Sequence, residues 1–268
     1  MNRRFFWLLV WVLLVGLVPY RVSAQLSFNA RLNTSRALLY EPVLLTLELR
    51  NETGRPVTLG DGTGPMLSID VESSPGRYMR QIAPHLLEEP LLLPPRTTVK
   101  HIINLTEAFQ IRQTTPYTVR AYVTWDDVSF GSGVMFLDVV PGLELLRRRG
   151  PASADGAGRR LYRVVSLFRD RSEHAFLQID DEQAGVCYGV IHLGRLVRLQ
   201  PPKLEIDDEA NVHVLHQAGP TQFLLHVYTP NGDRVLRKLY SAEGTQVDLV
   251  PEDDGQIRVS GAFSSRSD

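Results

Sequence analysis

Apolar and polar residues alternate with a period of two along most of this chain, and the 3.6-residue period of an amphipathic helix is almost absent. In residues 43–50, for example, every odd position is Val or Leu, and Thr46, Glu48 and Arg50 occupy most of the other face. Successive side chains of a strand point to opposite faces of a sheet. The pattern therefore predicts an all-β protein.

Residues 25–143 are predicted to form an immunoglobulin-like β-sandwich. About seven strands within about 115 residues, separated by turn residues at short spacing, are typical of that architecture. The strands are expected at residues 26–32, 43–50, 66–72, 78–83, 97–105, 117–125 and 129–140.

The composition changes after Pro141-Gly142, where three arginines precede a run of small residues. We predict a flexible linker over residues 144–158, a second antiparallel β domain over 159–263 and a tail over 264–268. Asn231-Gly232 predicts a hairpin, because both residues tolerate positive φ. The strands of this domain are expected at residues 161–168, 175–179, 186–199, 203–206, 212–217, 222–229, 234–240, 246–250 and 256–260.

The first 24 residues have the pattern of a signal peptide. Arg3 and Arg4 precede an apolar run over residues 5–18, and Val22-Ser23-Ala24 supplies a small-residue cleavage site before Gln25. The alternative is an uncleaved anchor, although the run is shorter than the ~20 residues of a spanning helix. We expect an exported protein, periplasmic or extracellular, with no stable membrane span after cleavage.

Charge and cysteine content exclude several classes of function and of stabilising group. The chain has 29 basic and 30 acidic residues, for a net charge of -1, which argues against nucleic acid as a partner. Only three basic residues are lysines, and this preference for arginine indicates a GC-rich, bacterial genome. The lone Cys187 excludes an intrachain disulfide and a cysteine-based metal cluster, and its apolar surroundings favour an inert thiol.

Two segments resemble known families. Tyr40-Glu41-Pro42-Val43, the segment 51–57 and Tyr117-Thr118-Val119-Arg120-Ala121-Tyr122 resemble bacterial extracellular immunoglobulin-like domains, a group that includes a proteinase-inhibitor-like module. The resemblance covers residues 26–140 and implies a sandwich, a role in adhesion or binding, and a tyrosine within residues 117–122 that forms a corner pinning a loop to the sheet. Residues 204–240 resemble a single propeller blade.

Histidines and acidic turns suggest a speculative metal site in the second domain. Its candidate ligands are His192, His213, His226, Asp207 and Asp208. Zinc or copper would favour the histidines, and calcium would favour the acidic turns at residues 180–182, 207–209 and 252–254. Neither HExxH nor an EF-hand spacing occurs, so we predict no cofactor and interpret the acidic segments as turns between strands.

Two further segments are candidates for binding. The tip Trp125-Asp126-Asp127 is expected at an exposed end of the sandwich, where loops often carry function. Leu91 and Leu92 belong to a leucine- and proline-rich stretch that either packs on the core, which we favour, or exposes an apolar patch to a partner.

The sequence contains no Gly-x-Ser-x-Gly nucleophile motif, and no other spacing points to catalysis. We predict an exported, non-catalytic binding protein that contacts protein or polysaccharide through loop tips or sheet edges. The alternative is a metal- or calcium-dependent enzyme or sugar-binding protein centred on the second domain, and a third possibility is a proteinase inhibitor.

Overall fold

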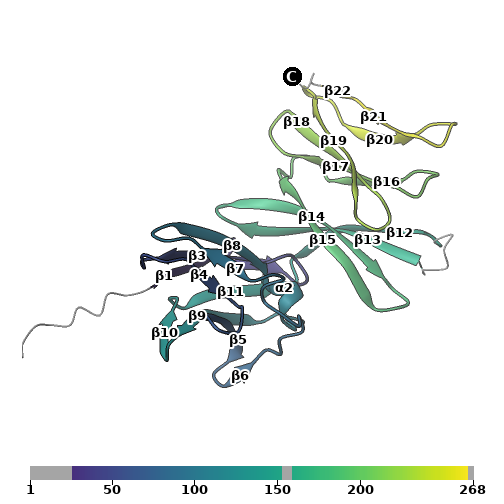
Figure 1. The fold of residues 1–268 in the computed structure, drawn as a ribbon. Helices are drawn as coiled ribbons and strands as arrows, with labels where there is room; N and C mark the ends of the chain where they lie inside the picture. The colour runs from purple at the N-terminus through teal and green to yellow at the C-terminus, as the bar shows by residue number, and fades with distance from the viewer. Residues whose placement is uncertain (1–25, 153–158, 265–268) are drawn as a thin grey trace, which may run out of the picture.

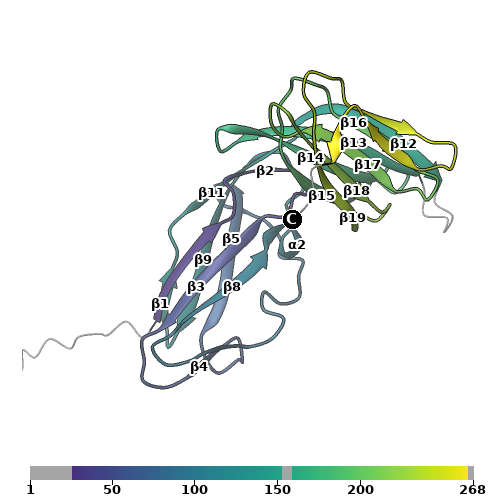
Figure 2. The ribbon, with the colours of Figure 1, turned by 90° about the horizontal axis from the view of Figure 1, so that it is seen from above.

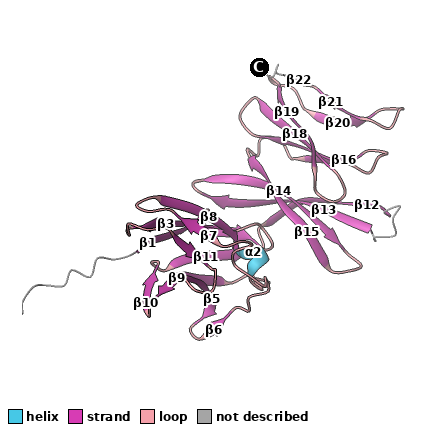
Figure 3. Cartoon of the chain, viewed as in Figure 1, coloured by secondary structure: helices cyan, strands magenta, loops and turns pink. Residues whose placement is uncertain are grey.

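The computed structural model describes residues 26–152 and 159–264, and these are built almost wholly of β-strands (Figure 3). The one helix among them is the short α2 (Leu105–Ala108). The all-β prediction is therefore confirmed. Within these residues, no helix is both long enough and apolar enough to cross a membrane. The predicted signal peptide lies outside the described residues.

Residues 26–140 form an N-terminal sandwich of two main sheets, seen at the purple-to-teal end of the chain in Figure 1. One sheet has the order β1-β3-β8 and the other β2-β11-β9-β5-β6, with β10 paired to β9 and a small β4-β7 pair at the side. The strands are β1 (Leu26–Leu32), β2 (Arg36–Leu38), β3 (Leu44–Asn51), β4 (Val57–Leu59), β5 (Met66–Ser74), β6 (Arg77–Tyr78), β7 (Leu91–Leu93), β8 (Thr98–Asn104), β9 (Pro116–Trp125), β10 (Val128–Gly131) and β11 (Met135–Val140).

The core of this sandwich comes from the alternate residues that the sequence pattern marks as apolar. Leu45 and Leu47 of β3 meet Val119 of β9 and Leu137 of β11 in one buried cluster. Tyr117 is also fully buried, and its hydroxyl donates a hydrogen bond of 3.0 Å to the Gln113 carbonyl. The predicted tyrosine corner is confirmed, and it fixes the loop that leads into β9.

The rest of the described chain forms a C-terminal unit of two larger sheets and one hairpin, green to yellow in Figures 1 and 2. The sheet orders are β12-β13-β14-β15 and β16-β17-β18-β19-β22, and β20 pairs with β21. The strands are β12 (Leu143–Ala152), β13 (Arg159–Arg169), β14 (Ser172–Asp181), β15 (Val186–Arg195), β16 (Lys203–Ile206), β17 (Val212–Gln217), β18 (Gln222–Tyr228), β19 (Arg234–Ser241), β20 (Asp248–Pro251), β21 (Ile257–Ser260) and β22 (Phe263–Ser264).

The strands β17 and β18 of the sheet β16-β17-β18-β19-β22 are buried on both faces, whereas β19 is mostly exposed. Val212 and Val214 of β17 face the β12–β15 sheet and join its core, whereas Leu215 packs under the β20–β21 hairpin. A strand covered on both sides needs apolar residues at nearly every position. This explains why β17 and β18 show weaker alternation than the strands of the sandwich.

The flexible linker predicted over residues 144–158 is wrong for its first part. Leu143–Ala152 forms β12, which pairs along β13 with Arg147 opposite Arg163 and Arg149 opposite Leu161. Arginine can pair in an exposed strand when carboxylates neutralise it, and Arg149 does so with Glu182 at 2.7 Å. The remaining linker residues, 153–158, are outside the described part of the chain.

The predicted turns are largely confirmed, with differences at residues 180–181 and 231. The acidic segments 207–209 and 252–254 lie in the turns β16–β17 and β20–β21, as expected, while Asp180 and Asp181 of the first segment end β14 and Glu182 begins the β14–β15 turn. The hairpin predicted at Asn231-Gly232 joins β18 to β19, but only Gly232 takes positive φ (94°). The loop is longer than two residues, and the Thr229 N–H donates to the Asp233 carbonyl at 2.9 Å.

Candidate protein-interaction site

One edge of the N-terminal sandwich is open to a partner strand. β8 ends the sheet order β1-β3-β8, and β3 is the one strand among the described residues that pairs with it (Figure 2). The Leu105 N–H donates to the Val43 carbonyl at 2.8 Å, so odd-numbered residues of this segment direct their backbone groups toward β3. In an antiparallel pair the next residues point the opposite way. The backbone groups of Lys100 and Ile102 therefore face the open edge.

A groove of about 490 Å³ runs between this edge and the segment that precedes β7. Its apolar members include Leu86, Leu91 and Ile102, and the Ile102 side chain is 59% exposed. The lining residues are Ala83, His85, Leu86, Glu88, Glu89, Pro90, Leu91, His101, Ile102, Ile103, Asn104, Glu107 and Ala108. Unpaired backbone groups beside an apolar channel are what an added strand requires.

The groove carries negative charge. Glu88, Glu89 and Glu107 line it, and none of the described lining residues is Lys or Arg. The neighbouring Lys100 ammonium lies 3.1 Å from the Glu48 carboxylate on the outer face of the sheet. Burial lowers the pKa of His101, and the Glu88 carboxylate opposes that shift. The groove is therefore complementary to a partner with apolar and basic side chains.

The sequence-predicted binding residues fall in two places. Leu91 lines the groove and packs against the core, and Leu92 is 56% exposed on the paired strand β7. The expected core contact of this leucine-rich stretch is thus confirmed at Leu91, while the exposed Leu92 could still contact a partner. Trp125 packs against the sandwich core at the far end of β9, and Asp126 and Asp127 form an exposed hairpin tip with positive φ. The structure does not bring this tip to the groove.

The five speculative metal ligands are not gathered in one place. His213 Nε2 lies 2.8 Å from Asp207 Oδ2, while the Asp208 N–H donates to the Gly255 carbonyl at 3.4 Å. His226 faces the other side of the sheet from His213, and His192 contacts a different histidine. In the described ranges, no group of three or more His, Cys, Asp or Glu side chains is placed to hold a metal ion.

The acidic turns have structural partners instead. Asp181 Oδ1 accepts backbone hydrogen bonds of 2.9 Å from Gln183 and Ala184, and its other oxygen lies 3.2 Å from Arg160. Asp207 caps its turn in the same way, through the Asn211 N–H at 2.8 Å. Carboxylates that accept local backbone N–H groups are the normal chemistry of such turns.

Sequence reasoning considered His226 only as a metal ligand and did not predict that it is buried against His216. His216 and His226 lie between the two large sheets with their rings stacked 5.5 Å apart. Burial lowers the pKa of His216 to about 3 and that of His226 to about 4. Backbone groups of β15, at Arg195 for His216 and at Leu193 for His226, raise the two pKa values slightly against this effect of burial. Both ring nitrogens of His216 and Nε2 of His226 are nevertheless buried without a hydrogen-bond partner in the described chain. Both imidazoles are therefore held neutral at physiological pH.

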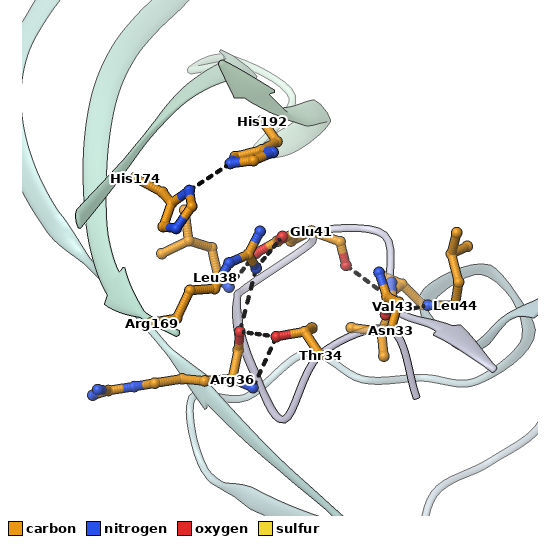
Figure 4. Close-up of polar contacts among 11 residues, drawn as sticks. Asn33, Thr34, Arg36, Leu38, Glu41, Val43, Leu44, Arg169, His174 and His192 are labelled. Atoms are coloured by element: carbon orange, nitrogen blue, oxygen red, sulfur yellow. Dashed lines mark hydrogen bonds and ion pairs between the residues drawn. The ribbon is translucent and has the colours of Figure 1, made fainter. Parts of the chain in front are cut away.

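A second missed feature is the contact between the sandwich and the C-terminal unit, shown in Figure 4. Glu41 Oε1 lies 2.6 Å from Arg169 Nη1, and Glu41 Oε2 accepts from the Leu38 N–H at 2.9 Å. Beside this ion pair, His174 Nδ1 lies 3.0 Å from His192 Nε2. Burial, with the nearby Arg169, lowers the pKa of His192 to about 4. On the other side of the His174 ring, Nε2 lies 2.8 Å from the Ser172 hydroxyl, so a Ser172–His174–His192 chain of contacts runs beside the ion pair.

Cys187 is half-buried on β15, and its Sγ lies 3.6 Å from the Gly189 carbonyl. Burial raises the pKa of this thiol to about 12, in agreement with the expectation of an inert cysteine.

No protein-family model matches the chain, and no curated protein matches its sequence.

Proposed function

We propose that this protein is an exported binding protein without catalytic activity, which holds an extended segment of a protein partner along the free edge of β8. The observation that carries the proposal is the groove beside β8, with unpaired backbone groups along one wall and apolar side chains along the other. The resemblance of residues 26–140 to extracellular immunoglobulin-like domains and the signal-like N-terminus support the same function.

Backbone hydrogen bonds give such an interaction its affinity, and alternate side chains give it specificity. A strand added to β8 places every second side chain toward Leu86, Leu91 and the three glutamates. Isolated edge strands are a hazard in natural proteins, which normally cover or charge them. An edge left open beside a shaped, acidic groove is therefore best explained by a partner strand with apolar and basic residues.

A peptide-binding measurement tests the proposal. Fluorescent peptides of about ten residues, alternating valine with lysine, should bind to residues 25–268, and matched valine–glutamate peptides should not. Ile102→Pro removes an N–H that faces the open edge and leaves the hydrogen bonds to β3 intact. We expect this variant to lose about tenfold in affinity, which is about 1.4 kcal/mol.

Ile102→Ala is the matched control, because it removes the same side chain and keeps the N–H group. It should bind far better than Ile102→Pro, and circular dichroism should show the same strand content in both. Equal binding of the lysine and glutamate peptides, or undiminished binding by Ile102→Pro, would overturn the proposal.

A further inference from the structure

The outer face of the second sandwich sheet carries an aligned row of side chains across four strands. Strand pairing places Phe136 of β11 opposite Thr118 of β9, Thr118 opposite Glu72 of β5, and Glu72 opposite Tyr78 of β6. Directly opposed residues point to the same face. The adjacent positions Leu137, Tyr117 and Val71 are buried, so the row faces outward.

Two exposed aromatic rings end this row. The Phe136 side chain is 69% exposed and that of Tyr78 is 60% exposed, although neither is needed by the core. They stand three strand spacings apart, which is about 14 Å. These strands belong to the sheet that does not contain β8, and in Figure 1 β9, β5 and β6 lie below β8.

Polar groups fill the space between the rings. A cleft of about 590 Å³ is lined by Phe136, Thr118, Glu72, Arg120 and Ser73, among others. The Thr118 hydroxyl donates to Glu72 at 3.4 Å, and the same carboxylate accepts from the Gly76 N–H at 3.0 Å. The Ser73 hydroxyl is buried and has no hydrogen-bond partner within the described chain. The Glu72 carboxylate also raises the pKa of Tyr78.

The charges of the cleft balance. Glu72 and Asp138 line it together with Arg120, and Asp138 is paired with Arg36 at 3.4 Å. A strongly anionic or cationic ligand would gain little from such a mixture. A neutral ligand with both apolar faces and many hydroxyl groups matches it better, because rings can stack on the faces while carboxylate, guanidinium and hydroxyl groups bind the hydroxyls.

We infer that this face binds a neutral polysaccharide. Phe136 lines the cleft and stacks on a sugar ring there, Tyr78 stacks on another just beyond the lining residues, opposite Glu72, and Glu72, Thr118 and Arg120 bond to hydroxyls between the two rings. The volume lies within the range of small-ligand sites. The distance between the aromatic rings calls for an oligosaccharide of several rings. The site is separate from the β8 groove and does not depend on the peptide-binding function.

Calorimetric titration with soluble hexasaccharides tests this inference. The probes are β-1,4-linked glucose, β-1,4-linked N-acetylglucosamine and α-1,4-linked glucose, each added to residues 25–268. At least one should bind, and Phe136→Ala and Tyr78→Ala should each weaken it about tenfold. Tyr78→Phe keeps the ring and should retain most of the affinity.

Phe263→Ala is the control for a generic exposed aromatic, because Phe263 is 84% exposed in the C-terminal unit. It should bind as the unaltered protein does, and so should Ile102→Pro, which separates this site from the β8 groove. The inference is overturned if none of the three sugars binds, or if Phe136→Ala and Tyr78→Ala bind the sugar as the unaltered protein does.

Discussion

At the residue scale, a buried ion pair between Arg160 and Asp181 anchors the C-terminal unit. The side chains of Arg160 and Asp181 are each 5% exposed, with their charged atoms 3.2 Å apart. The Arg160 guanidinium also lies 3.7 Å above the Tyr188 ring and donates to the Pro230 carbonyl. Asp181 thereby joins β13, the β14–β15 turn and the β18–β19 loop.

Asp181→Asn should be destabilising, because it keeps an acceptor for the turn and removes the carboxylate charge that lies 3.2 Å from the buried Arg160 guanidinium. Breaking one side of a buried ion pair costs about 3–5 kcal/mol. The neighbouring Glu182→Gln is the control, since its pair with Arg149 is exposed and should contribute less than about 1 kcal/mol. Urea unfolding measures both, and equal losses would contradict this account.

At the element scale, β17 and β18 are buried on both faces and carry two neutral histidines. The folded pKa values of about 3 for His216 and about 4 for His226 lie below the usual value near 6.5. Between these limits the unfolded chain binds more protons than the folded one. The stability that the two neutral histidines contribute is therefore fully present above pH 6.5, and it is lost as the pH falls toward 4.

We expect the free energy of unfolding to fall below pH 6.5 by up to about 1.4 kcal/mol per pH unit for each histidine. The double variant His216→Leu/His226→Leu should flatten this dependence, because leucine does not titrate and fills a similar volume. Urea unfolding at several pH values measures the slope. His85→Leu, at an exposed site, should leave it unchanged; the same slope in the double variant would disprove the assignment.

At the scale of the whole molecule, one buried ion pair and a small apolar cluster join the sandwich to the C-terminal unit. Leu38 of β2 packs with Val165, Leu167 and Phe176 of the β12–β15 sheet. Gly142 lies at the same contact with φ of 70°, and a Cβ there would come within 2.6 Å of Leu38 and Val165. These contacts set one orientation of the two parts.

Arg169→Met should loosen this orientation, because it leaves the buried Glu41 carboxylate without its cation at a cost of about 3 kcal/mol. Small-angle X-ray scattering should then show a larger radius of gyration. Arg50→Met breaks an exposed pair within the sandwich and should not change the scattering. An unchanged radius in Arg169→Met would show that the apolar cluster alone fixes the two parts.

The sequence by itself determined most of the strands, the faces of β1, β3 and β9, the acidic turns and a tyrosine corner within residues 117–122. Each depends on residues close together in the chain, because alternation and turn chemistry are local. The core contact of Leu91 was also predictable from the sequence, since a leucine-rich stretch with prolines must either pack on the core or bind a partner. The sequence did not predict β2, β4, β7 or β12, and the strand expected over residues 78–83 is reduced to the two-residue β6. The arginines of β12 misled the linker prediction, because two of their carboxylate partners, Glu182 and Glu205, lie far away in the sequence.

Only the tertiary structure decided which strands became edges and which distant residues met. Glu41 and Arg169 are 128 positions apart, and Phe136 and Tyr78 share a face only through the strand order β11-β9-β5-β6. The β8 groove likewise needs the segment before β7 to pass beside an unpaired edge. No local pattern encodes such meetings, because the packing of whole sheets around a common core selects them.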